Sequence, residues 1–268
     1  MTRFQIVLPA RLASSRLSEK LLQRVNGKTV LQYTYESASR AKVAQQGVIV
    51  AVDHPRLADE VESFGGRWVM TPADCASGTD RVAHVAAQLP AVDVLVNVQS
   101  DEPEIDPDSI DAVAMTLSDD SEADLGTAAT PIIDPAALTD PGIVKVVMGQ
   151  PAELAATQGS GAGQSSAVKG RAVYFSRACV PFDRDGDPVD RLQQVPATYW
   201  HHLGLYAYRP DFLRWFASAP QSYLERVEKL EQLRAIEAGK KVVVAVVGPA
   251  ASGIDTPADL AAFRARQA

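Results

Sequence analysis

The fold is decided near the N-terminus by the stretch Phe4-Gln5-Ile6-Val7-Leu8-Pro9-Ala10-Arg11 and the polar residues that follow it as far as Lys20. The apolar run Phe4–Leu8 has the length and content of a buried strand. Pro9 cannot donate a hydrogen bond to a sheet ladder, so we expect it to end that strand. A loop with two arginines and one lysine follows, and a helical pattern resumes only near Thr29. A strand, a basic loop and a helix in this order can bring backbone N–H groups and cations together around an anion.

The basic loop matches neither of two general phosphate-binding motifs. It lacks the G-x-x-x-x-G-K-[ST] pattern of a Walker loop and the G-x-G-x-x-G fingerprint of a dinucleotide-binding fold. Charged residues are ordinary on protein surfaces. From these residues alone, a solvated surface turn is the simpler interpretation and an anion site is the alternative.

Strand and helix patterns alternate over the first hundred residues. Near-continuous apolar runs such as 47–52 and 92–98 are typical of strands that are buried on both faces. Alternation of this kind predicts a parallel sheet with helices on both faces. The expected strands are 4–8, 47–52, 68–70 and 92–98, and the expected helices are 30–38, 55–64 and 78–89.

The loops that begin at Pro9, Asp53 and Gln99 all leave C-terminal ends of these strands. Ligands of open α/β sheets bind beyond those ends. We therefore predict an α/β fold with a Rossmann-like, mostly parallel sheet, and a ligand site where the three loops meet.

The second half of the chain is less regular. A Gly/Ser-rich stretch at 149–170 predicts a flexible loop without a catalytic role. Thr256 and Pro257 are a capping residue and a first-turn proline, which predict the start of a last helix. Strands are expected at 126–133, 143–147, 172–175, 203–208 and 241–247, and helices from 210 and over 223–238.

The composition is that of an ordinary globular protein, with 268 residues, 46% hydrophobic and 22% charged. A net charge of −7 argues against a nucleic-acid-binding protein. We see no apolar run long enough to span a membrane and no leader-like start, so we expect a cytoplasmic protein without a membrane partner. Cys75 and Cys179 are too few for a disulfide framework or a zinc site.

The opening stretch resembles the signature of the nucleotide-sugar cytidylyltransferases, in particular the CMP-Kdo synthetase (3-deoxy-manno-octulosonate cytidylyltransferase) family. That family has a strand, P-A-R, S/T-R-L and a lysine, which here are Pro9-Ala10-Arg11, Ser15-Arg16-Leu17 and Lys20. Ser18-Glu19 stands where the family often has Pro-Gly. The resemblance implies that Arg11 and Lys20 hold the triphosphate of CTP, within a nucleotide-binding loop formed by Pro9, Ala10, Arg11, Arg16 and Lys20.

Two acidic stretches resemble further motifs of this family. Asn97-Val98-Gln99-Ser100-Asp101-Glu102-Pro103 is similar to N-V-Q-G-D-E-P, with serine in place of glycine. The stretch Gly253–Leu260 is similar to G-[IV]-D-T-P-x-D-L. Read alone, each is also an ordinary helix start. The resemblance implies that Asp101 and Asp255 ligate Mg²⁺, a hard cation held by one or two carboxylates with phosphate oxygens and water.

The remaining motifs concern the base and the sugar. Asp74–Arg81 resembles D-x-x-S-G-T-[DE]-R, which implies that Ser77, Gly78 and Arg81 lie at the cytidine nucleotide. Tyr174–Phe182, His202–Arg209 and Leu224–Arg234 resemble Y-F-S-R-x-x-[IV]-P-[WF], H-x-G-[IL]-Y-x-Y-R and L-E-x-x-E-x-L-E-Q-L-R. Gln99 is expected to reach the nucleotide or the sugar acid. The implied sugar-binding residues are Gln99, Arg177, His202, Tyr206, Glu228, Glu231 and Gln232.

Helical spacing places Glu228 and Gln232 on one face of the expected helix 223–238, and we expect Glu225 and Lys229 to face solvent. His202 and Tyr206 lie four apart on an expected strand, so both should point to the same face. The planar guanidinium of Arg177 suits a carboxylate of the sugar acid.

The resemblance implies that CMP is transferred from CTP to the eight-carbon acidic sugar Kdo for lipopolysaccharide biosynthesis, with release of pyrophosphate. Asp101, Asp255, Lys20 and Arg11 would be catalytic, Mg²⁺ the cofactor, and a homodimer the assembly. One domain is expected, in which 1–125 mainly binds CTP, 126–240 forms a smaller mixed β/α part for the sugar and the dimer, and 241–268 returns to the metal site. A sister nucleotidyltransferase with another base or acidic sugar is one alternative, and a non-catalytic nucleotide-binding regulator is the other.

Overall fold

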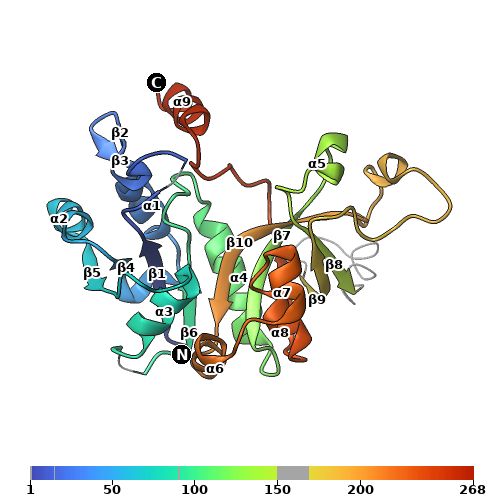
Figure 1. The fold of residues 1–268 in the computed structure, drawn as a ribbon, viewed down its shortest axis with the longest axis horizontal. Coiled ribbons are helices and arrows are strands. Elements are labelled where there is room, and N and C mark those ends of the chain that lie inside the picture. The colour runs from blue at the N-terminus through green and yellow to red at the C-terminus, as the bar shows by residue number, and fades with distance from the viewer. Residues whose placement is uncertain (1, 15, 90, 150–168) are drawn as a thin grey trace, which may run out of the picture.

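The computed structural model, which describes residues 2–14, 16–89, 91–149 and 169–268, is built around one nine-stranded mixed sheet. The strands lie in the order β5-β4-β1-β6-β10-β7-β11-β9-β8 (Figure 1). Their bounds are β1 (Phe4–Ala10), β4 (Val48–Val52), β5 (Arg67–Met70), β6 (Val94–Asn97), β7 (Leu125–Pro131), β8 (Lys145–Gly149), β9 (Lys169–Ser176), β10 (Trp200–Tyr208) and β11 (Val242–Val246). A small hairpin of β2 (Arg24–Val25) and β3 (Lys28–Thr29) stands apart from the sheet.

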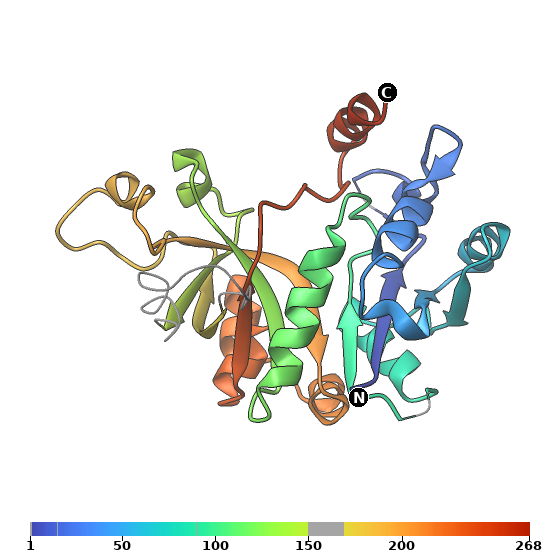
Figure 2. The same cartoon turned by 180° about the vertical axis from the view of Figure 1, so that it is seen from behind.

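Helices cover both faces of the sheet, as predicted. On one face α1 (Val30–Ala38), α2 (Pro55–Ser63) and α4 (Pro107–Asp119) pack on an apolar core (Figure 2). On the other face lie α3 (Gly78–Ala86), α6 (Pro210–Ser218), α7 (Tyr223–Glu228) and α8 (Leu233–Glu237). Two further helices, α5 (Pro135–Thr139) and α9 (Pro257–Arg266), lie at the end of the sheet to which the C-termini of β1, β6 and β7 point.

The α/β class is confirmed, but the prediction of a mostly parallel sheet is not. Strands β5, β4, β1 and β6 are parallel to one another. The long strand β10 then pairs antiparallel with both β6 and β7. Beyond β10, strand β11 is parallel to β7. Strand β9 then pairs antiparallel with β11, and β8 pairs antiparallel with β9. Among the described residues, the second half therefore extends the same sheet, because β10 joins the two halves edge to edge.

Strand β1 continues through Pro9 to Ala10, whereas we expected Pro9 to end it. Pro9 lies in register with Ala51 of β4. Its carbonyl points to the other side, where it accepts a hydrogen bond from the Ser100 hydroxyl. The nitrogen of a strand residue points the same way as its carbonyl, and the β6 ladder has already ended at Asn97 on that side. The missing N–H of Pro9 therefore interrupts no ladder bond.

The expected helix 223–238 is broken into α7 and α8. Lys229 ends α7 in the left-handed conformation with φ 55°. Glu228 and Gln232 therefore do not share a helix face, and the expectation that they do is wrong. The expectation that Glu225 faces solvent is also wrong, because its carboxylate is buried against Arg234 of α8 at 2.6 and 2.8 Å.

The C-terminal segment after β11 crosses back to the first half of the chain (Figure 2). Ile254 donates its N–H to the carbonyl of Asp101 at 2.8 Å. Helix α9 is capped by Thr256 and packs through Phe263 on Tyr33 of α1, with ring centroids 5.1 Å apart. This return brings Asp255 to the end of β6.

The Gly/Ser-rich stretch predicted to be a flexible loop lies outside the described residues, apart from its ends at Gly149 and Lys169–Gly170. Within the described part of the chain, no helix has the length and apolar character needed to cross a bilayer.

The buried pair of Glu225 and Arg234 yields a stability prediction. Arg234 also donates to the Phe216 and Ala219 carbonyls, so it ties α8 to the end of α6. Glu225→Ala leaves a buried guanidinium without its carboxylate, and we expect it to lower the free energy of unfolding by about 3–5 kcal/mol. Arg214→Ala removes the exposed pair with Asp211 and is expected to cost less than about 1 kcal/mol. Urea unfolding of both variants measures the difference, and equal losses would contradict the prediction.

Candidate functional site

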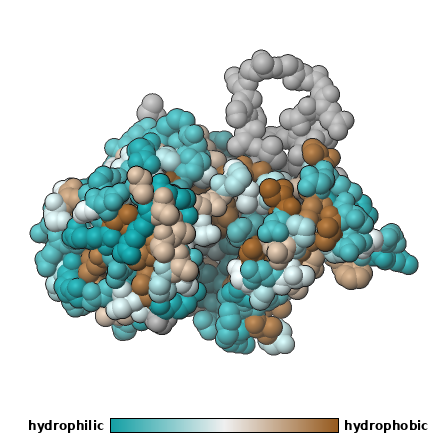
Figure 3. Space-filling model, turned by 90° about the horizontal axis from the view of Figure 1, so that it is seen from above, coloured by the Kyte–Doolittle hydropathy of each residue, from teal (hydrophilic) through white to brown (hydrophobic). Residues whose placement is uncertain are grey.

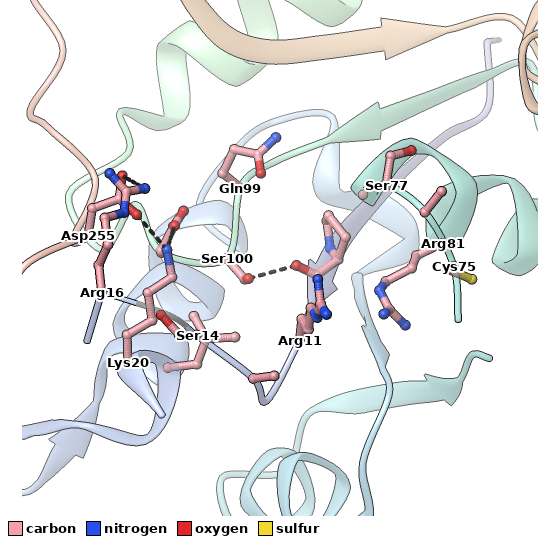
Figure 4. A pocket seen from close by; sticks show the side chains of 16 residues that line it. Arg11, Ser14, Arg16, Lys20, Cys75, Ser77, Arg81, Gln99, Ser100 and Asp255 are labelled. Carbon is pink, nitrogen blue, oxygen red and sulfur yellow. Dashed lines mark hydrogen bonds and ion pairs between the residues drawn. The ribbon is translucent and has the colours of Figure 1, made fainter. Parts of the chain in front are cut away.

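A cavity of about 580 Å³ opens beyond the C-terminal ends of β1 and β6 (Figure 4). Seen from above, the surface is hollowed between the two halves of the molecule (Figure 3). The loop after β1, the start of α3, the loop after β6 and the segment before α9 all contribute to its wall. The predicted residues that line it are Pro9, Arg11, Arg16, Lys20, Ser77, Gly78, Arg81, Gln99, Asp101 and Asp255. Ala10 lies fully buried behind it in β1.

Lys20 is held between the two predicted metal ligands. Its ammonium donates to the carboxylates of Asp101 and Asp255, at 2.8 Å from the latter. Arg16 forms a second ion pair with Asp255 at 2.9 Å (Figure 4). Burial by itself lowers the pKa of Lys20, but the two carboxylates outweigh it and raise the pKa above its ordinary value. The two cations and two carboxylates thus form one ionic cluster without net charge, beyond the C-terminal end of β6.

Asp101 and Asp255 are close enough to share one ammonium, so both can approach a single cation. Among the described residues, no group of three or more His, Cys, Asp or Glu side chains stands together as a metal site. Mg²⁺ does not require one, because protein carboxylates usually supply only one or two of its ligands and phosphates and water supply the rest. The two aspartates therefore fit a magnesium ion that arrives with a nucleotide.

Glu102 is a further carboxyl at this position, directly after Asp101. Burial raises its pKa to about 8, and the charge of Asp101 adds to the shift. The adjacent carboxyls are thus accommodated in different ways: Asp101 is ion-paired, and Glu102 takes up a proton near neutral pH.

The N-terminus of α3 faces the same cavity. Ser77 accepts from the Asp80 N–H at 3.1 Å, and the Asp80 carboxylate accepts from the Ser77 N–H at 2.9 Å. Gly78 lets this helix approach β1 closely, because a Cβ there would lie 3.3 Å from the Pro9 ring. The helix expected from Gly78 is therefore present and capped by Ser77, and its start lies directly beside the Pro9 loop.

Arg81 lines the cavity, but its guanidinium is bonded to protein groups. It donates to the Thr71 hydroxyl, the Pro72 carbonyl and the Asp53 carboxylate at 2.8, 2.9 and 3.2 Å. Both side chains of the Asp53 pair are almost fully buried. This arrangement favours a structural role for Arg81, in which it holds Asp53 in place, over a direct contact with a nucleotide.

The predicted sugar-binding residues lie farther along the sheet, and of these only Gln99 lines the cavity. Gln99 donates to the Gly204 carbonyl of β10 at 3.3 Å, which links the two regions. His202 and Tyr206 do share a face, with ring centroids 5.6 Å apart. Both are buried and contact Gln232, whose amide accepts from the Tyr206 hydroxyl at 3.4 Å.

Arg177 and Glu228 form a second part of this region. The Glu228 carboxylate accepts from the Ser176 hydroxyl at 2.7 Å and from the Arg177 N–H at 3.0 Å. The guanidinium of Arg177 donates to the carbonyls of Glu228, Pro141 and Lys229. The structure therefore brings the two residues together, but it turns the guanidinium to backbone carbonyls and not to the cavity.

Glu231 connects the two regions from the other side. Its carboxylate accepts from the Thr79 hydroxyl of α3 at 2.7 Å, and burial raises its pKa. It lines a neighbouring cavity of about 440 Å³ that shares Ala76 and Ser77 with the first. Glu231 thus contacts α3, whereas Glu228 contacts Ser176 and Arg177.

Sequence reasoning gave no role to Asp53 or Ser100, although both hold the loop that carries Arg11. The sequence predicts a ligand-site loop that begins at Asp53 and shows Ser100 as a departure from the family glycine, but it assigns no partner to either side chain. Their positions at strand ends were the available signal, since side chains there point at neighbouring loops. Ser15 of the predicted motif lies outside the described residues.

Comparison with known proteins extends over nearly the whole chain. Residues 5–242 match the sequence model of the family described as Cytidylyltransferase. A 3-deoxy-manno-octulosonate cytidylyltransferase of Rhodopirellula baltica is 54% identical over 261 residues, which cover 97% of each chain. Another, of Syntrophotalea carbinolica, is 44% identical over 95% of this chain and 94% of its own. The solved structure of a CMP:2-keto-3-deoxy-manno-octonic acid synthetase complexed with CTP is 35% identical with a TM-score of 0.84, covering 99% of this chain and 98% of that one.

The buried His202 generates a pH prediction. Burial, with a smaller effect of His201, lowers the pKa of His202 from 6.5 to about 3. As the pH falls from about 6.5, the unfolded chain binds a proton at this residue that the folded chain does not, so stability decreases by up to about 1.4 kcal/mol per pH unit. We expect His202→Gln to lose about 2–3 kcal/mol less unfolding free energy than the wild type between pH 7 and pH 4.5. Urea unfolding at both pH values tests this, and the same loss in both proteins would show that His202 is protonated in the fold.

Proposed function

Because the chain belongs to the cytidylyltransferase family, we propose that it transfers CMP from CTP to 3-deoxy-D-manno-octulosonate (Kdo), giving CMP-Kdo and pyrophosphate for lipopolysaccharide biosynthesis. The observation that carries the proposal is the convergence of Arg11, Lys20, Asp101 and Asp255 on one cavity at the ends of parallel strands. Relatives of high identity along the full length bear the name of this activity.

The nucleotide would lie between the Pro9 loop and the N-terminus of α3. Hydrogen bonds hold the backbone of this loop at Pro9 and Leu12, and they leave the exposed Arg11 side chain over the cavity. Phosphoryl transfer depends mainly on positioning and on neutralising charge that develops on the leaving oxygens. Arg11 and Lys20 would neutralise the departing pyrophosphate, a role for which preorganised cations are well suited.

We propose that Asp101 and Asp255 hold the Mg²⁺. A bound divalent ion neutralises phosphate oxygens and lowers the pKa of a group that it coordinates. In the structure both carboxylates are satisfied by Lys20, and Asp255 also by Arg16. Uptake of a metal therefore requires these cations to leave the carboxylates, and the released Lys20 is then available to the triphosphate.

Kdo would bind beside Gln99, at the residues Arg177, His202, Tyr206, Glu228, Glu231 and Gln232. Their polar groups are bonded to one another, to neighbouring side chains such as Thr79 and Ser176, or to the backbone. Sugar binding would exchange these internal hydrogen bonds for bonds to hydroxyls and to the carboxylate, at little net cost in hydrogen bonding. Gln99 spans both regions, so it would lie where the sugar meets the α-phosphate.

We also propose a homodimer that acts in the cytoplasm, where CTP is available. The arm formed by residues 177–199 extends away from the sheet (Figure 1). Phe182 and Val195 on this arm are 86% and 89% exposed. Exposed apolar residues of this size suit a protein interface. Apolar residues also gather on the surface of this half of the molecule (Figure 3).

The activity is tested by incubating the protein with CTP, Kdo and Mg²⁺ and following pyrophosphate release and CMP-Kdo formation. We expect Asp101→Asn and Asp255→Asn each to lower turnover by about 10²–10³-fold, because each removes charge from the proposed metal site. Glu104→Gln is the matched control, since Glu104 follows in the same loop but pairs with Arg266 outside the cavity. Near-normal turnover in either aspartate variant would contradict the metal site, and no product with CTP and Kdo would contradict the function.

The ion pairs of Lys20 generate a separate prediction about metal binding. Without nucleotide, the ammonium competes with a divalent cation for the same oxygens, so we expect Lys20→Met to bind Mn²⁺ at least about tenfold more tightly than the wild type. Electron paramagnetic resonance of Mn²⁺ measures this without any turnover. Lys28→Met is the control, because Lys28 pairs with Glu36 away from the cavity. Unchanged Mn²⁺ affinity in Lys20→Met would show that the metal does not use these carboxylates.

A further inference from the structure

The carbonyl of Pro9 accepts a hydrogen bond from a side chain, at a point where the neighbouring strand β6 has already ended. The ladder between β1 and β6 ends at Val7 and Asn97, and Val98 donates one last N–H to the Val7 carbonyl at 3.1 Å. The next acceptor on that side is the Pro9 carbonyl. The almost fully buried hydroxyl of Ser100 donates to it at 2.7 Å. The glycine of the motif N-V-Q-G-D-E-P, which this stretch resembles, would lack the hydroxyl that makes this bond.

The backbone of Ser100 is itself held by helix α1. Thr34 of α1 is fully buried, and its hydroxyl donates to the Ser100 carbonyl at 3.0 Å. The same hydroxyl also bonds to the Val30 carbonyl one turn earlier in the helix. Ser100 is therefore anchored to a helix of the core, and the position that it gives to Pro9 is set by the sheet and by α1 together.

The backbone on the other side of Arg11 is held by Asp53. One oxygen of this carboxylate accepts from the Leu12 N–H at 2.9 Å, and the other accepts from Arg81 at 3.2 Å. Arg81 is in turn bonded to the Thr71 hydroxyl and the Pro72 carbonyl, beyond the end of β5. Asp53 is thus held in place by the ends of two strands and by α3.

We propose that Ser100 and Asp53 are positioning residues for Arg11, which together clamp the backbone on both sides of it. The clamp fixes the direction in which the exposed guanidinium leaves the loop, while no bond of the clamp uses that guanidinium. The inference rests on the proposed function, in which Arg11 binds the triphosphate. The clamp makes the cation ready for the phosphates before the nucleotide arrives, so less freedom is lost when CTP binds.

A double-mutant cycle on CTP binding tests the clamp. Calorimetry would give the dissociation constant of CTP with Mg²⁺ for the wild type, Ser100→Ala, Arg11→Ala and the double variant. We expect Ser100→Ala to weaken CTP about fivefold, as for the loss of one hydrogen bond that orders a contact. In the Arg11→Ala background the same change should have less than about a twofold effect, because residues that act through one another are not additive.

CMP, which lacks the outer phosphates, separates positioning from a general loss of structure. Its affinity should barely change in Ser100→Ala, since Arg11 is assigned to the triphosphate. Ser37→Ala is the matched control: its buried hydroxyl donates to the Ile105 carbonyl at 2.6 Å from the same helix α1, away from the cavity. It should leave the affinities for CTP and CMP unchanged. Asp53→Asn enters a second cycle with Arg11→Ala, provided that its melting curve shows a folded protein.

The outcomes distinguish the clamp from the function on which it rests. Unchanged CTP affinity in Ser100→Ala, with a clear loss in Arg11→Ala, would overturn the clamp and leave the proposed function intact. An equal loss from Ser100→Ala in both backgrounds would also overturn it, because the effect would not pass through Arg11. Normal CTP binding by Arg11→Ala would contradict the assignment of Arg11, and the clamp with it.

Discussion

Two carboxylates on one ammonium hold distant parts of this chain together. Lys20 comes from the loop after the first strand, Asp101 from the loop after β6 and Asp255 from the segment that precedes the last helix. Like charges at this spacing would repel each other strongly without a cation between them. Lys20 and Arg16 neutralise the aspartate of the C-terminal segment at the point where this segment returns to the sheet. The two carboxylates are thus already gathered around a positive charge, as the proposed divalent ion would require.

The parallel arrangement of β4, β1 and β6 accounts for what surrounds this ionic group. Parallel strands end at the same edge of the sheet, and their last backbone groups lose their ladder partners there. Side chains from neighbouring loops take over these groups: the Ser100 hydroxyl at Pro9 and the Asp53 carboxylate at Leu12. The floor of the cavity is consequently rigid backbone, while Arg11, which stands on it, has an exposed side chain. A cation on a backbone that is already held in place can bind a charged ligand with little reorganisation.

The second half of the molecule obeys a different constraint, which is the satisfaction of buried polar groups. His202, Tyr206 and Gln232 lie in an apolar core and hydrogen-bond to one another or to Thr127. The same requirement explains the break between α7 and α8, because a single straight helix would not direct the Glu225 carboxylate at Arg234. Burial lowers the pKa of His202, so its ring takes part in this cluster as a hydrogen-bonding group and not as a charge. Hydrogen-bonding groups of this kind suit the proposed sugar, whereas the cations of the first half suit the phosphates of the proposed nucleotide.

The sequence by itself determined the family, the α/β class, the helices that begin at Gly78 and Pro257, and most of the charged and polar residues of the cavity wall. These follow from local patterns: apolar runs for strands, capping residues before helices, and motifs of polar residues at strand ends. Only the tertiary structure decided that β10 runs antiparallel between β6 and β7, since strand pairing depends on contacts far apart in the chain. It also decided that Lys20 lies on Asp101 and Asp255, that Arg177 turns to backbone carbonyls, and that Ser100 and Asp53 hold the loop of Arg11. A side chain's partner depends on where other segments bring their charges and carbonyls, and that information lies in the packing of the whole chain and not in any one stretch of it.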